Sequence, residues 1–143
     1  MNSLFIALVA MFSLTLGGCA LPPKPDSDRL KADSKRLNDL EKVFKSTTQF
    51  GEQFWHASKR LADQRGPAII HAVMVRSQKW QGEEGLIFVP LVALLPRRPS
   101  LQILHQYQRS KLESDRIWSR EFIIEFEMSD TMEMVARYSQ TKQ

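Results

Sequence analysis

The chain has 143 residues, a hydrophobic content of 43%, a charged content of 25% and a formal net charge of +4 at pH 7. This length suits one domain, and this composition is ordinary for a globular protein, which excludes disorder for the bulk of the chain. The charge excess is mild and the basic residues are scattered among acidic ones. We therefore expect no nucleic-acid partner, which would need clustered basic side chains with interleaved aromatics.

A short apolar segment near the N-terminus predicts a signal peptide. Leu4 to Leu16 contains thirteen residues and no charge. A transmembrane helix needs about 20 apolar residues, whereas the apolar part of a signal peptide has about 7–15. The sequence therefore predicts a signal peptide over residues 1–18, although Met1-Asn2-Ser3 has no lysine or arginine.

The residues Leu16-Gly17-Gly18-Cys19 end this segment, and Cys19 is the only cysteine, so no intramolecular disulfide can form. They resemble the lipobox of bacterial lipoprotein precursors, in which an aliphatic residue and two small residues precede a cysteine. The resemblance covers only the N-terminal segment of the chain. It implies cleavage before Cys19, acylation of Cys19 and attachment to a membrane through the acyl chains.

The residue after the cysteine bears on which membrane the resemblance implies. In enterobacterial lipoproteins an aspartate at this position favours retention in the inner membrane, and this chain has Ala20. The resemblance therefore implies the periplasmic face of the outer membrane. Residues 19–27 read CALPPKPDS, and three prolines in four residues favour a polyproline II tether. We expect residues 28–143 to form a single periplasmic domain.

Apolar residues at helical spacing follow the tether, over residues 28–65. Ser27 or Asp28 can cap the start, Gly51 favours a break near the middle, and Gly66-Pro67 ends the segment. The apolar stripe consists of Leu30, Leu37, Leu40, Phe44, Phe54 and Leu61. It admits two interpretations: the helical segment covers a sheet formed by the following residues, or it pairs with another chain in a coiled coil.

Beyond the helical segment the pattern changes to one that predicts strands. Ala68 to Val75 is an apolar run broken by His71, and its length suits a buried strand, although a buried helix gives the same run. Leu86 to Leu95 is nearly all apolar, and Pro90 within it favours an edge strand, a bulge or two short strands. Leu101 to Gln108 is a further predicted strand.

Two alternating segments near the C-terminus, Arg120 to Met128 and Thr131 to Tyr138, predict a β-hairpin. A three-residue loop, Ser129 to Thr131, keeps apolar residues opposite apolar residues. The predicted pairs are Phe126 with Met134, Ile124 with Ala136 and Phe122 with Tyr138. The fold class that follows is α+β: an N-terminal helical segment packed on an antiparallel sheet of four or five strands within residues 67–140.

The residue types that can catalyse reactions or bind metals form no recognised motif in this sequence. His56, His71 and His105 lie far apart in the sequence and fit no metal-binding spacing. His71 interrupts an apolar run, which is typical of a hydrogen-bonded core histidine. With Cys19 acylated, no thiolate is left for catalysis or zinc binding. We therefore expect a protein that is not an enzyme and that holds neither a metal nor a cofactor.

Two features predict a binding surface. Trp55 follows Phe54 on the helical segment, and since neighbours on a helix lie about 100° apart, we expect Phe54 in the core and Trp55 available to a partner. Arg97 and Arg98 lie between two prolines, directly after the apolar Leu86–Leu95 run. This loop either offers two guanidinium groups to lipid headgroups or an acidic partner, or forms a solvated turn.

The leading functional hypothesis is a non-enzymatic accessory lipoprotein that docks onto an envelope assembly of the secretion, conjugation or pilus type. One alternative is a small ligand or lipid carrier, in which helix and sheet enclose an apolar cavity. Another is a surface-exclusion or inhibitor lipoprotein. An enclosed pocket above about 300 Å³ would favour the carrier, whereas a filled core with an exposed apolar patch would favour docking.

Overall fold

The computed structural model describes residues 24–140, and over this range the chain is helical and contains no strand. The helices are α2 (Ser27–Ser46), α3 (Glu52–Arg65), α4 (Ile69–Ser77), α5 (Val89–Leu94), α6 (Arg97–Tyr107), α7 (Glu113–Glu125) and α8 (Ser129–Ser139). Two 3₁₀ turns, η1 (Gly66–Ala68) and η2 (Glu83–Phe88), precede α4 and α5. The α+β prediction is therefore wrong. The predicted signal peptide and Cys19 lie outside the described residues.

The N-terminal helical segment is confirmed, and it consists of two helices. Asp26 caps α2, one residue earlier than predicted, because its carboxylate accepts a hydrogen bond of 2.9 Å from the backbone N–H of Arg29. The break comes at Phe50, which has a φ of 54°, and at Gly51, which precedes α3. Gly66, with a φ of 66°, ends α3 in a conformation that favours glycine.

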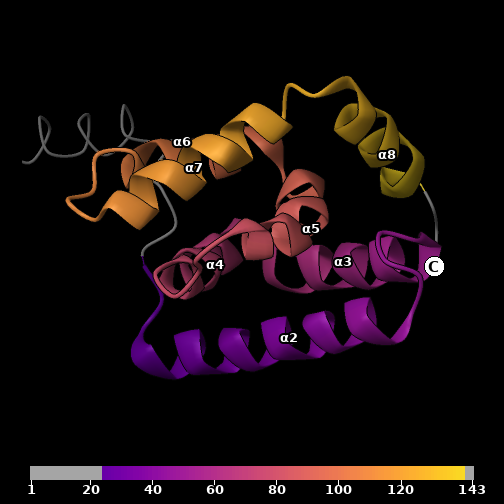
Figure 1. Cartoon of the computed structure of the whole chain (residues 1–143), viewed down its shortest axis with the longest axis horizontal. Helices are drawn as coiled ribbons and strands as arrows, with labels where there is room; N and C mark the ends of the chain where they lie inside the picture. Colours follow the sequence, from indigo (N-terminus) through magenta and orange to yellow (C-terminus); the bar gives the residue numbers. More distant parts are fainter. Residues whose placement is uncertain (1–23, 141–143) are drawn as a thin grey trace, which may run out of the picture.

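The apolar stripe of the first helix packs on other helices of the same chain. Figure 1 shows α2 along one side of the molecule, beneath α3 and α4, and both of these helices contact it. Leu37, Leu40 and Phe44 on α2 and Phe54 and Leu61 on α3 are buried. The stripe therefore covers helices and not the predicted sheet. Because these residues are buried within the chain, they leave no apolar seam for an intermolecular coiled coil.

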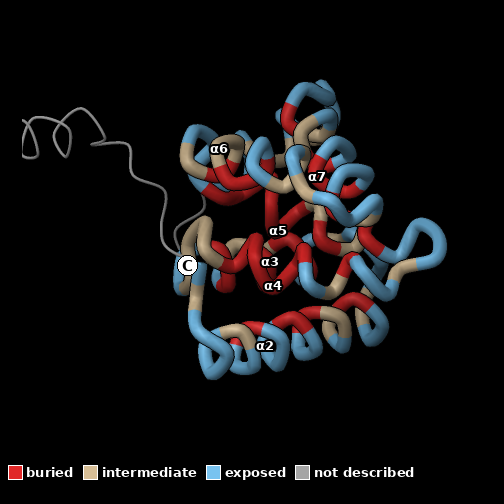
Figure 2. The backbone as a smooth tube through the Cα atoms, turned by 90° about the vertical axis from the view of Figure 1, so that its left-hand side faces the viewer, coloured by how far each residue is buried: buried red, intermediate tan, exposed pale blue. Residues whose placement is uncertain are grey.

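The segment predicted as a strand with an edge proline is the central helix of the fold. Pro90 lies in the first turn of α5, where the missing backbone N–H costs no hydrogen bond. The side chains of Leu91 and Val92 are almost completely buried, and α5 contacts α3, α7 and α8. Figure 2 shows the buried parts of the backbone gathered around α3, α4 and α5. An apolar run this uniform carries no period that separates a strand from a buried helix.

The other two predicted strands in the middle of the chain are also helices. In α4 every residue from Ile69 to Met74 is buried, so this part of the helix is buried on all sides and shows no apolar stripe. In α6 the buried residues are Ser100, Ile103 and Leu104, which have the spacing of one helix face.

The two segments predicted to form a β-hairpin lie in helices α7 and α8 and the residues between them, so none of the predicted cross-strand pairs exists. Phe122 and Phe126 are buried, as the strand prediction required, but four residues is also one helical turn. Ile124 and Met128, which the strand pattern placed inward, are 44% and 48% exposed. A strand repeats every two residues and a helix about every 3.6, so residues four apart share a face in both. The helix α7 also explains why Ile124 is exposed.

Candidate functional site

Trp55 lies in the core and is not an exposed anchor. It is 5% exposed, and its indole ring stacks on the ring of Tyr138 from α8, with ring centroids 5.3 Å apart and planes at 12°. Phe54 on the same helix is completely buried. Both aromatics of this pair are covered because α8, which the sequence placed in a sheet, packs against α3. The expectation that Trp55 is available to a partner is therefore corrected.

Arg97 and Arg98 are exposed, but they form the first turn of α6 and not a loop. The guanidinium group of Arg97 pairs with the carboxylate of Glu127, which follows α7. Both side chains are about half or more exposed, so this pair adds little stability. The side chain of Arg98 forms no hydrogen bond or ion pair within residues 24–140. Of the two arginines, Arg98 is the one whose charge is available to a partner.

An open groove lies beside Arg97. It has a volume of about 480 Å³ and is open to solvent along one side. Helix α5 and the residues after it line one wall, α8 lines the other, and two residues of α3 complete the lining. The lining residues are Lys59, Asp63, Ala93, Leu94, Leu95, Pro96, Arg97, Phe126, Thr131, Met132, Val135, Ala136 and Ser139. Most of these side chains are apolar, so the groove offers apolar surface bounded by a few charges.

The charges on the rim of the groove are paired with one another. The ammonium group of Lys59 lies 2.7 Å from the carboxylate of Asp63, one turn further along α3. On the other side Arg97 pairs with Glu127. Because each positive charge has a negative neighbour, the rim has no strong net charge, and the apolar walls dominate what the groove can bind.

A second groove lies on the other side of α8. It has a volume of about 340 Å³, and its lining includes Trp55, Pro90 and Met134. Thr131 contributes to both grooves. Helix α8 therefore lies between two hollows. It packs on α5 and α3, and Tyr138 is its buried residue, with an exposed fraction of 5%. The sequence missed this arrangement because it assigned α8 to a sheet. The helical spacing of Met134, Val135 and Tyr138 was the pattern in the sequence that could have predicted this helix.

A separate polar cluster joins α4, α6 and α7. The Nδ1 atom of His71 and the hydroxyl group of Tyr107 share a hydrogen bond of 2.6 Å, which confirms His71 as a hydrogen-bonded core residue. Burial, aided by the positive charge of Lys24, lowers the pKa of His71. Burial, aided by the negative charge of Asp115, raises the pKa of Tyr107 to about 12. Both groups are therefore neutral near pH 7.

The other two histidines are hydrogen-bonded to residues outside this cluster. The Nε2 atom of His56 lies 3.3 Å from the carboxylate of Glu52, and His105 shares a hydrogen bond of 3.0 Å with Gln108. Among residues 24–140, no three His, Cys, Asp or Glu side chains gather closely enough to hold a metal ion. Within the same range, no helix has the length and apolar character needed to cross a membrane.

The chain was compared with family models, curated proteins and solved structures. None of these three comparisons gives a match.

Proposed function

We propose that this protein is a lipid-anchored accessory protein of the outer membrane that binds a protein of an envelope assembly, of the secretion, conjugation or pilus type, and that it is not an enzyme. The lipobox-like Leu16-Gly17-Gly18-Cys19 supports the anchor. The open groove between α5 and α8 supports the docking role, and it is the observation that carries this proposal.

The shape of the groove favours a protein partner over a small ligand. A carrier buries most of the surface of its ligand in a largely closed pocket. Here the core is filled by fully buried side chains such as Phe88, Leu91 and Ile103, and the hollow lies at the surface, open along one side. An open apolar groove of this size fits the apolar side chains of one face of an amphipathic helix.

The surroundings of the groove indicate the chemistry of the partner segment. Because the rim charges of Lys59, Asp63, Arg97 and Glu127 are paired, the segment needs apolar anchors and no strong charge of its own. Met132, at the edge of the groove, is 48% exposed, and an unbranched, flexible side chain of this kind adapts to different anchors. The exposed guanidinium group of Arg98 lies next in sequence to the rim residue Arg97 and would favour an acidic residue at one end of the segment.

Site-specific photo-crosslinking in cells tests this function. A photo-reactive amino acid replaces Met132, which lines the groove, or Glu133, which is exposed on α8 and does not line it. We expect an adduct with one envelope protein from position 132 and none from position 133. Mass spectrometry of the adduct then identifies the partner and the segment that carries the crosslink.

A blocking variant makes the same test specific. Ala136 is exposed and lines the groove, so Ala136→Lys places a charged chain in it while changing the free energy of unfolding by about 0.5 kcal/mol or less. We expect the adduct from position 132 to disappear in this variant and to persist with Glu133→Lys. Equal adducts in both variants would reject the groove as the docking site. A small apolar molecule that co-purifies with the wild type and is lost from Ala136→Lys would favour the carrier.

A further inference from the structure

The start of the described chain and the turn between α6 and α7 lie at the same end of the molecule. Figure 1 shows both at one end of the long axis, with α8 at the other. The contacts agree with the picture. Lys24 is close enough to His71 for its charge to lower the pKa of the imidazole, and His71 is hydrogen-bonded to Tyr107, the last residue of α6.

The chain length between the proposed acylation site and the described body is short. Five residue steps separate Cys19 from Lys24. A fully extended chain spans at most about 3.6 Å per residue, so the two residues can be no more than about 18 Å apart. If Cys19 is at the membrane surface, the end of the molecule that carries Lys24 and the α6–α7 turn is therefore held close to that surface.

Hydrogen bonds fix the shape of this turn. The hydroxyl group of Ser110 donates to the buried carboxylate of Asp115 at 2.7 Å and accepts from the backbone N–H of Leu112 at 3.1 Å. The guanidinium group of Arg116 donates to the backbone carbonyl of Ser110 at 2.8 Å. As a result Leu112 is held at the surface, where it is 49% exposed.

The side chains around Leu112 are mostly basic. Arg109 and Lys111 are exposed and form no hydrogen bond or ion pair through their side chains within the described part of the chain. Arg116 is also exposed, and Glu113 is the acidic residue beside them. An apolar side chain flanked by free cations is suited to an anionic membrane surface, where the apolar group enters the interface and the cations meet phosphate groups.

We propose that the α6–α7 turn contacts the headgroups of anionic phospholipids, with Leu112 in the interface and Arg109 and Lys111 on the phosphates. This contact rests on the proposed acylation of Cys19, which brings the turn within reach. It orients the body so that α8, with the grooves on its two sides, points away from the membrane toward a partner (Figure 1).

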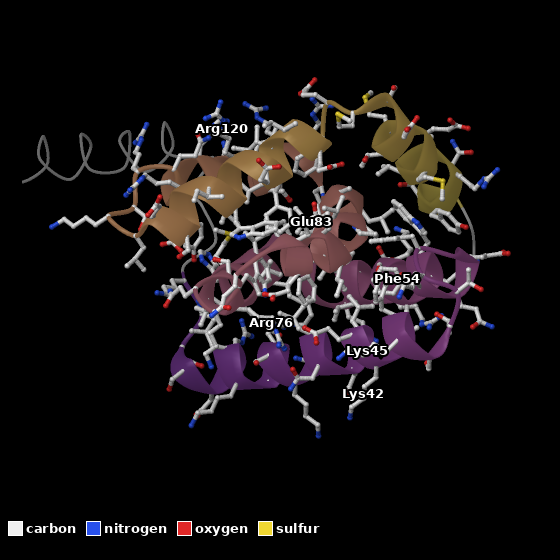
Figure 3. The ribbon with its side chains drawn as sticks, in the orientation of Figure 1. Lys42, Lys45, Phe54, Arg76, Glu83 and Arg120 are labelled. Carbon is white, nitrogen blue, oxygen red and sulfur yellow. The ribbon has the colours of Figure 1, made fainter. Side chains whose placement is uncertain are left out.

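Fluorescence quenching on the mature, acylated protein tests the contact. Because Cys19 is the only native cysteine and is acylated, Leu112→Cys supplies one free thiol for a fluorophore. Lys42→Cys is the control: Figure 3 shows Lys42 on the outer side of α2, and it lies 15 residues, or about 22 Å of helix, from Ser27. The protein is reconstituted into vesicles of phosphatidylethanolamine with phosphatidylglycerol, and the quencher is a nitroxide on the lipid headgroup.

We expect the label at position 112 to be quenched in these vesicles and the label at position 42 to stay unquenched. Adding Arg109→Gln and Lys111→Gln to Leu112→Cys should abolish the quenching, and so should vesicles of phosphatidylcholine alone. Flotation of the vesicles separates the two proposals. Protein that floats with equal quenching at both positions overturns the membrane contact alone, whereas protein that does not float overturns the anchor and the contact together.

Discussion

A buried acidic residue holds the two N-terminal helices together. Asp33 follows Leu30 by three residues and precedes Leu37 by four, so it occupies the apolar stripe of α2, and it is completely buried. Its carboxylate accepts two hydrogen bonds from the guanidinium group of Arg65, one of them 2.9 Å long. This pairing joins the start of α2 to the end of α3. A buried carboxylate is tolerated only with such a partner.

His71 makes the stability of the protein depend on pH. Its folded-state pKa is lowered from the ordinary value of 6.5, so below that pH the unfolded chain binds a proton that the folded chain resists. The stability from a neutral His71 is present above pH 6.5 and is lost as the pH falls toward the folded-state pKa. We expect the free energy of unfolding to decrease between pH 7 and 5.5, by at most about 1.4 kcal/mol per pH unit.

His71→Gln should remove much of this decrease, because an amide keeps a hydrogen-bonding group for Tyr107 and does not titrate. Urea unfolding at several pH values measures the effect. His105→Gln is the matched control, since the side chain of His105 is exposed and shares a hydrogen bond with Gln108 three residues away. If His71→Gln shows the same dependence on pH as the wild type, the decrease comes from other groups.

Helices were predicted correctly where apolar residues at helical spacing were accompanied by residues that start or end a helix. Gly51 and Gly66 mark the start and the end of α3, and the helical segment that contains α2 and α3 was predicted, although the cap of α2 is Asp26 and not Ser27 or Asp28. The patterns failed for α4 and α5 because burial on all sides removes the period. They failed for α7 because Phe122 and Phe126, four residues apart, satisfy a strand and a helix equally.

Alanine substitutions on α7 distinguish the two periods experimentally. A strand would place Phe122 and Ile124 on the same buried face, whereas the helix buries Phe122 to 1% exposure and leaves Ile124 44% exposed. We expect Phe122→Ala to lower the free energy of unfolding by about 3–5 kcal/mol and Ile124→Ala by about 0.5 kcal/mol or less. Denaturant unfolding measures both values. Losses of similar size would favour the strand pattern.

The candidate binding surface was predictable only in part, because it is a property of the whole molecule. The arginines between two prolines were recognised from their neighbours in the sequence, and both are exposed. Trp55 was misassigned because the residue that covers it, Tyr138, lies 83 positions later in the chain. The groove was missed because its walls come from α3, α5 and α8, which meet only in the folded structure.

In the proposed lipid anchoring, the position of the whole molecule on the membrane depends on Cys19. Each buried methylene of an acyl chain contributes about 0.8 kcal/mol, and two or three chains hold a protein stably, whereas a few basic side chains at about 1 kcal/mol each do not. We therefore expect Cys19→Ser to abolish incorporation of labelled palmitate and to release the body from washed membranes. The chain has no second cysteine that could be acylated in place of Cys19.

Ala20→Asp is the matched control, because it keeps Cys19 and changes only the neighbouring residue. By the resemblance to enterobacterial lipoproteins, this variant should still incorporate palmitate but move from the outer to the inner membrane fraction. Gradient separation of the two membranes after palmitate labelling measures both outcomes. A Cys19→Ser protein that still takes up palmitate and stays with the membranes would show that attachment does not occur through this cysteine. The groove and the α6–α7 turn would then face the envelope in an orientation set by another contact.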